Sequence, residues 1–168
     1  AAVAHGGFAE EVVTDSVNAI EIPDDMSYEV ASTIPIAYGT SYLALVNRAR
    51  VEKDEVVLVH GASGGVGLTA VEISHALGAY VIATASTSEK LAIAKSYGAD
   101  ALINYAEENI SSSVFDVVNG VDVVFDPVGG DAFQESMHCV LPGGRILIIG
   151  FASGTVPQIP ANHLLVKD

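Results

Sequence analysis

The chain has 168 residues, of which 50% are apolar and 17% are charged, and its formal net charge is −14 at pH 7. The apolar content excludes an intrinsically disordered chain, and the negative charge argues against nucleic-acid and membrane-surface partners. The single cysteine, Cys139, excludes a disulfide within the chain. It is also typical of a reducing, cytoplasmic setting.

The N-terminal part of the chain has an irregular pattern. Residues 6–13 and 18–23 predict short strands separated by turn-forming residues. Residues 26–49 predict helix on both sides of Pro35.

From residue 56 onward, short apolar runs alternate with helical patterns. The predicted strands cover residues 56–60, 80–85, 101–105, 121–126 and 145–150. The predicted helices cover residues 65–79, 87–98, 107–118 and 131–141. This alternation predicts an α/β fold with a doubly wound, Rossmann-like parallel sheet and right-handed crossovers. We expect a nucleotide at the carboxyl ends of the strands, where the strand order reverses between the first and fourth strands.

A glycine-rich run, GASGGVG at 61–67, lies between the first strand and an amphipathic helix. Gly64 would let the backbone approach a diphosphate, and Gly67 would let the helix pack tightly on the strand. Backbone amides at the helix N-terminus favour an anion there. The alternative is a glycine turn that binds no ligand. The predicted phosphate-binding residues are Ala62, Ser63, Gly64, Gly65 and Val66.

The same glycines also fit the GxxxGxG spacing of short-chain dehydrogenases. Those enzymes need a Tyr followed four residues later by Lys, and no tyrosine of this chain has a lysine at that spacing. A P-loop is excluded as well, because no Lys-Ser/Thr pair follows the glycines.

The end of the second strand indicates which dinucleotide is preferred. An NAD-binding domain usually places an acid there to accept from the ribose 2′-hydroxyl, whereas this chain has Ala85 and Ser86, with Lys90 close behind. A 2′-phosphate would therefore meet hydroxyl donors and a cation, which favours NADP(H) over NAD(H). The alternative for Lys90 is a solvated surface lysine.

Residues near the other strand ends are weaker candidates. Val128 follows the fourth strand and would face a cofactor, while Asp126 would either face it or cap the next helix. Gly150, Phe151 and Ala152 follow the fifth strand and could flank a nicotinamide. The five histidines lack metal-ligand spacing, so we interpret them as structural and predict no metal site. Cys139 is interpreted as a core residue.

Taken together, several motifs resemble the quinone oxidoreductase branch of the medium-chain dehydrogenase/reductases: HGASGGVGL (60–68), GTSYLAL (39–45), FDPVGG (125–130) and GRILIIGFASG (144–154). The resemblance implies zinc-independent, NADPH-dependent reduction of a small molecule, either a quinone or an α,β-unsaturated carbonyl. It implies that Lys90 and Tyr105 contact the 2′-phosphate, that Thr40 lies near the nicotinamide, and that the full-length protein is a homodimer.

The resemblance also suggests a domain organisation. Residues 1–25 are similar to the end of a GroES-like catalytic domain, and residues 26–168 to an NADP-binding domain truncated at its C-terminal end. The catalytic residues are then unknown, and we expect the isolated chain to be inactive. Alternative functions are an enoyl- or acryloyl-CoA reductase, a carrier-linked enoyl reductase, and a non-catalytic NADP(H)-binding module.

Overall fold

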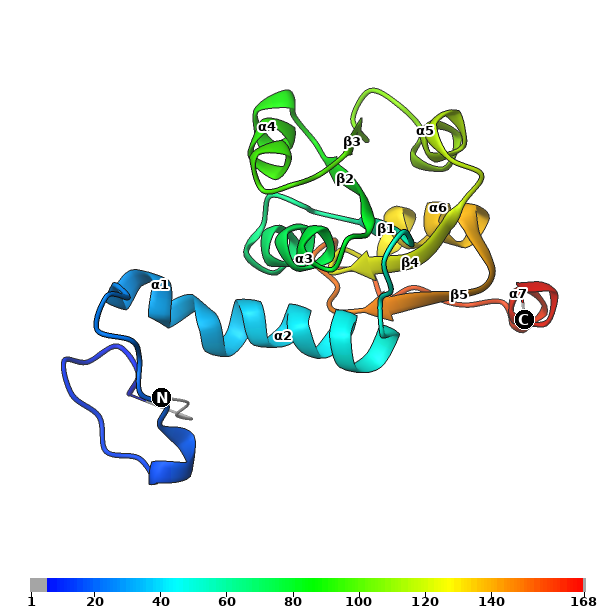
Figure 1. Cartoon of the computed structure of the whole chain (residues 1–168). Coiled ribbons are helices and arrows are strands. Elements are labelled where there is room, and N and C mark those ends of the chain that lie inside the picture. The colour runs from blue at the N-terminus through cyan, green and yellow to red at the C-terminus, as the bar shows by residue number, and fades with distance from the viewer. Residues whose placement is uncertain (1–5, 168) are drawn as a thin grey trace.

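The computed structural model describes residues 6–167, which form one sheet of five strands (Figure 1). Its order is β3-β2-β1-β4-β5 and every pair is parallel. The order reverses between β1 and β4, which confirms the doubly wound sheet. The strands are β1 (Val56–Val59), β2 (Tyr80–Ala85), β3 (Ala101–Asn104), β4 (Val121–Asp126) and β5 (Val140–Ile148).

Helices follow the strands and cover both faces of the sheet (Figure 1). They are α3 (Gly65–Ala76), α4 (Ser88–Ser96), α5 (Ile110–Val117), α6 (Gly130–Cys139) and α7 (Ala161–Lys167). Alternate strand residues face opposite sides. Val57 and Phe125 pack with Ala70 of α3, while Leu58 packs on the other side with Val114 of α5. Burial on both faces explains why β1 is apolar at every position, without the alternation of a strand that has one face in water.

A long helical segment precedes the sheet and confirms the helix predicted around Pro35 (Figure 1). It comprises α1 (Tyr28–Thr33), η2 (Ile34–Tyr38), α2 (Gly39–Tyr42) and η3 (Leu43–Ala49), in which η2 and η3 have the wider turns of a π-helix. Pro35 lies within η2 and lacks an amide hydrogen, so it cannot make the usual helical bond. Leu45 is fully buried and joins the segment to the core.

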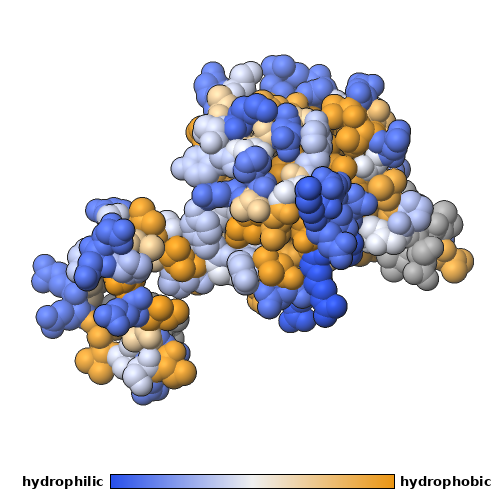
Figure 2. All heavy atoms as spheres, viewed as in Figure 1, coloured by the Kyte–Doolittle hydropathy of each residue, from blue (hydrophilic) through white to orange (hydrophobic). Residues whose placement is uncertain are grey.

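The two strands predicted at 6–13 and 18–23 are wrong. The described residues before Tyr28 contain only one short 3₁₀ helix, η1 (Ser16–Asn18). Phe8 and Val13 are fully exposed, and Figure 2 shows apolar side chains on the surface of this protruding segment. A strand needs a neighbour for its backbone hydrogen bonds, and the described residues supply none here.

The boundary between α6 and β5 also differs from the prediction. The helix predicted at 131–141 is shorter in the structure: α6 ends at Cys139 and β5 begins at Val140, so Pro142 and Gly143 lie within the strand. The register shifts where β5 pairs with β4, because Val121 faces Val140 while Val123 faces Arg145. This irregularity places the Pro-Gly-Gly stretch in an edge strand, where a missing amide donor is tolerated. The strand also ends at Ile148, two residues earlier than predicted.

Within residues 6–167, no helix has both the length and the apolar character needed to cross a bilayer.

Candidate functional site

A groove of about 660 Å³ lies at the carboxyl edge of the sheet. It is formed by the turn between β1 and α3, the end of β2, and the loops after β4 and β5. Eight of the residues predicted from sequence line it together: Ser63, Gly64, Val66, Ser86, Lys90, Tyr105, Val128 and Ala152.

The glycine turn forms one wall of the groove. The Ala62 amide donates to the Thr84 carbonyl at 3.0 Å, and the Gly64 amide donates to the Gly61 carbonyl at 2.9 Å. Helix α3 then starts at Gly65 and runs for 12 residues. The amides of its first turn have no acceptor within the helix, so this end can hold an anion.

The helix approaches the turn closely because Gly67 has no side chain. A Cβ at this position would lie 2.2 Å from the Gly61 carbonyl oxygen and 3.0 Å from the Ala62 Cα. The glycine therefore has the packing role that the motif predicted.

Polar groups gather at the ends of β2 and β3. The Thr87 hydroxyl caps α4 by accepting from the Lys90 amide at 3.3 Å. The Lys90 Nζ donates to Ser86 Oγ at 3.3 Å. The Tyr105 amide donates to the Ala85 carbonyl at 3.2 Å, which places Tyr105 beside this pair. Hydroxyl groups and an ammonium thus occupy the position where an acid would select an unphosphorylated ribose.

The charge of the groove differs from that of the chain. Among the described residues that line the groove there is no Asp or Glu, and Lys90 is the only Lys or Arg. The chain as a whole has a net charge of −14. An anionic ligand would therefore find a local cation and helix-end amides within a repulsive overall field.

Five predicted site residues do not line the groove: Thr40, Ala62, Gly65, Gly150 and Phe151. Ala62 is buried under the turn, and Gly65 is exposed at the start of α3. Thr40 lies on α2, where the neighbouring Ser41 donates to the Val66 carbonyl at 2.9 Å. Thr40 is therefore held next to the first turn of α3.

Of the three residues predicted in the loop after β5, Ala152 lines the groove, whereas Gly150 and Phe151 do not. Ala152 and Ser153 line the groove, because their amides donate to the carbonyls of Pro127 and Val128, each at 3.0 Å. Ser153 was not a candidate from sequence. Pairing between two loops leaves no periodic signal by which it could have been found.

Asp126 braces the loop after β4 and does not cap α6. Its Oδ1 accepts from the amides of Val128 and Gly129, each at 2.8 Å. The N-cap of α6 is Gly129, which has no capping side chain. The carboxylate thus fixes the segment that supplies Val128 to the groove.

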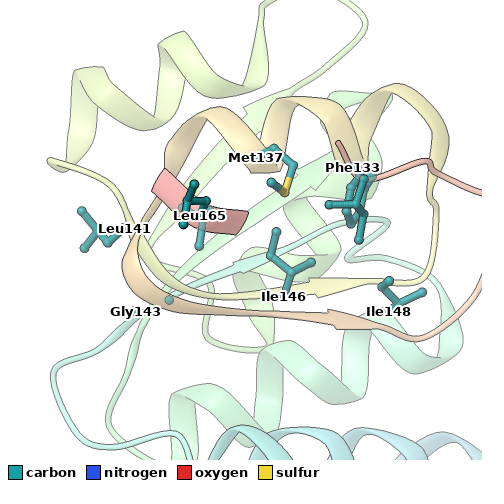
Figure 3. Close-up of a pocket in the computed structure, with 10 residues that line it drawn as sticks. Phe133, Met137, Leu141, Gly143, Ile146, Ile148 and Leu165 are labelled. Atoms are coloured by element: carbon teal, nitrogen blue, oxygen red, sulfur yellow. The ribbon is translucent and has the colours of Figure 1, made fainter. Parts of the chain in front are cut away.

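Two other hollows have a different chemistry. One, of about 520 Å³, shares Gly61, Tyr105, Val128 and Ser153 with the groove but includes Glu108, Asp131 and Glu135. The other lies between α6 and β5, where Figure 3 shows Phe133 and Met137 above Ile146 and Ile148. Its lining residues are apolar or glycine, so it offers no side-chain partner for a phosphate.

The described histidines do not form a metal site. His60 is fully buried, with Nδ1 at hydrogen-bond distance from Thr84 Oγ1 (3.1 Å) and Nε2 from Ser136 Oγ (2.6 Å), whereas His75 and His138 are exposed. His5 lies outside the described residues. Within residues 6–167, no three His, Cys, Asp or Glu side chains cluster so as to hold a metal ion. Cys139 is buried in the core, as predicted.

The fold and the groove define a dinucleotide-binding α/β domain. The chain belongs to the medium-chain dehydrogenase/reductases and is quinone oxidoreductase-like: the family described as zinc-binding dehydrogenase matches residues 65–168. This confirms the resemblance noted in the sequence.

Three comparisons illustrate the relationship. A quinone oxidoreductase-like protein 2 homolog of Nematostella vectensis is 42% identical over 166 residues, covering 97% of this chain and 45% of that protein. The quinone oxidoreductase of Thermus thermophilus, whose structures include an NADPH complex, superposes with a TM-score of 0.83 and 34% identity, covering 98% of this chain and 52% of that one. A highly reducing polyketide synthase of Didymella fabae is 35% identical over 134 residues, which is 77% of this chain and 7% of that protein. The chain spans about half the length of the first two relatives.

Proposed function

We propose that the groove binds NADP(H), and that the whole protein transfers hydride from NADPH to a quinone or an α,β-unsaturated carbonyl without a metal. The observation that carries the proposal is that the glycine turn, Ser86, Lys90 and Tyr105 line one groove free of carboxylates. The NADPH complex of the Thermus thermophilus relative supports the choice of cofactor.

Each predicted site residue, whether or not it lines the groove, has a role in this proposal. The first-turn amides of α3 hold the diphosphate, while Lys90, Ser86 and Tyr105 hold the 2′-phosphate. Val128 packs against the adenosine half. Thr40, Gly150 and Phe151 are assigned to the nicotinamide half, with Ala62 and Gly65 shaping the turn. When bound, the reduced nicotinamide supplies the hydride.

The cofactor preference is tested by Lys90→Ala. We expect affinity for NADPH to fall about 10- to 100-fold, because one charge-assisted hydrogen bond contributes roughly 1.5–3 kcal/mol. Affinity for NADH should stay within about twofold, since NADH has no 2′-phosphate. Both dissociation constants are measured by titration calorimetry.

Lys95→Ala is the matched control. Lys95 lies on the same helix, but its Nζ donates to the Asp100 carbonyl at 3.2 Å and it does not line the groove. Its removal should leave both affinities unchanged. Equal losses of NADPH and NADH binding in Lys90→Ala would mean that Lys90 supports the fold and not the phosphate.

The hydride acceptor requires an assay on the whole protein. NADPH oxidation is followed with 1,4-benzoquinone, with crotonyl-CoA and with no acceptor, each with and without a zinc chelator. Quinones and enones accept hydride directly, and hydrogen bonds can stabilise the resulting oxyanion, so turnover should survive chelation. Activity lost on chelation and restored by zinc would point to an alcohol dehydrogenase, whose alkoxide needs a Lewis acid.

The same assay tests the second candidate, a carrier-linked enoyl reductase. The similarity to a polyketide synthase over 134 residues favours it. Turnover of crotonyl-CoA but not of benzoquinone would identify an enoyl thioester as the acceptor, as in an enoyl-CoA or carrier-linked enoyl reductase. Cofactor binding with no turnover would indicate a non-catalytic NADP(H)-binding module.

We further propose a cytoplasmic homodimer for the whole protein.

A further inference from the structure

Three polar residues lie side by side under the groove. Val59 pairs with Ala83 on one side and with Phe125 on the other, so the next residues, His60, Thr84 and Asp126, form a row across three strands. None of the three is more than 1% exposed. They face the same side of the sheet as Leu58, the side covered by α5 and α6.

The hydrogen bonds of His60 assign one tautomer to its ring. Ser136 has a single hydroxyl proton, which it donates to the Ala132 carbonyl at 2.9 Å. At the 2.6 Å contact, His60 Nε2 must therefore carry a hydrogen and donate to Ser136 Oγ. His60 Nδ1 then accepts from the Thr84 hydroxyl at 3.1 Å. Both ring nitrogens are satisfied in the neutral imidazole.

The partners of His60 belong to the segments that build the groove. His60 directly precedes Gly61, and Thr84 stands two residues before Ser86. The Thr84 carbonyl also accepts from the Ala62 amide in the glycine turn. Ser136 lies on α6, which starts directly after the Val128–Gly129 loop. The imidazole thus connects the glycine turn, the end of β2 and α6.

We propose that His60 is a positioning residue, whose two ring hydrogen bonds hold the glycine turn at the distance from β2 and α6 that a dinucleotide requires. This inference rests on the proposed cofactor function of the groove. It differs from a purely stabilising role in the core. A positioning role predicts that loss of these hydrogen bonds weakens dinucleotide binding more than an equally destabilising substitution elsewhere in the core.

Thr84→Val tests the proposal with little change in side-chain volume. It removes the donor to Nδ1, and we expect the dissociation constants of NADPH and NADH to rise together by about fivefold to tenfold, the effect of losing one neutral hydrogen bond. Thr84→Ser keeps the hydroxyl and should bind almost as wild type does. Hydrogen exchange at the amides of Ala62 and Gly64 should be faster in Thr84→Val only.

Val114→Ala provides the matched control for stability. Val114 of α5 is fully buried on the same side of the sheet as Thr84, but it does not line the groove or the hollow of about 520 Å³ beside it. It should lower Tm at least as much as Thr84→Val while leaving both affinities and the exchange of the turn amides unchanged. If instead Thr84→Val binds as wild type does, or Val114→Ala weakens binding equally, the positioning role is wrong.

The two proposals fail differently in this experiment. A wild-type chain that binds neither dinucleotide overturns the cofactor function and the positioning role with it. A wild-type chain that binds NADPH, together with a Thr84→Val variant of unchanged affinity, overturns the positioning role alone. Lys90→Ala should weaken the binding of NADPH only, whereas Thr84→Val should weaken the binding of NADPH and NADH alike. The two variants therefore distinguish a lost contact with the 2′-phosphate from a change in the geometry of the turn.

Discussion

Gly67→Ala is expected to lower the free energy of unfolding by about 3 kcal/mol, the upper part of the usual range for overpacking a tight contact. The added methyl group would lie 2.2 Å from the Gly61 carbonyl oxygen and 2.9 Å from the Gly61 carbonyl carbon. Both are backbone atoms, and the same carbonyl accepts from Gly64, so relief of the contact must open the glycine turn. Urea unfolding measures the loss, and titration calorimetry should detect a matching loss of NADPH binding.

Gly65→Ala is the control for this substitution. A Cβ on Gly65 would have no atom within 4 Å, and Gly65 is not among the glycines with positive φ. Its stability should therefore change by less than about 0.5 kcal/mol, as for other open surface positions. If Gly67→Ala unfolds at the same urea concentration as Gly65→Ala, the close packing of α3 against the turn is wrong.

The sheet and the glycine turn could be predicted because their signals are local. A strand buried on both faces favours an unbroken apolar run, and residues 56–59 supply such a run. The glycine run predicted a phosphate-binding turn because a buried strand precedes it and an amphipathic helix follows it. Lys90 was predicted from its local sequence as well, because it closely follows the end of the second strand, where the acid typical of an NAD-binding domain is absent.

Features that depend on distant partners could not be predicted. The composition of residues 6–13 is compatible with a strand, but pairing requires a second strand that the described residues do not place there. Ser153 reaches the groove only because its loop pairs with the loop after β4. The contact of His60 with Thr84 and Ser136 depends on strand register and on the packing of α6. None of these relations appears in the local sequence.

The stability of the chain is expected to fall by about 2 kcal/mol between pH 7 and pH 5 because of His60 alone. Burial lowers the pKa of His60 from 6.5 to about 4, and the nearby Asp126 carboxylate opposes this shift only in part. Between these two pKa values the unfolded chain binds a proton that the folded chain excludes. Acidification therefore favours unfolding, and the contribution of His60 is fully lost once the pH falls through about 4.

Denaturant unfolding of wild type and His60→Gln at pH 7 and pH 5 measures this contribution. The variant has no imidazole at position 60, so its free energy of unfolding should fall by about 2 kcal/mol less than that of wild type. His75→Gln, which removes an exposed histidine on α3, should keep the wild-type pH dependence. If His60→Gln does not fold, the imidazole Cε1–H resonance of His60 in the native chain gives the answer directly. That resonance should not titrate above pH 5; a midpoint near 6.5 would show that the ring is accessible to protons and that the buried, neutral state described for it is wrong.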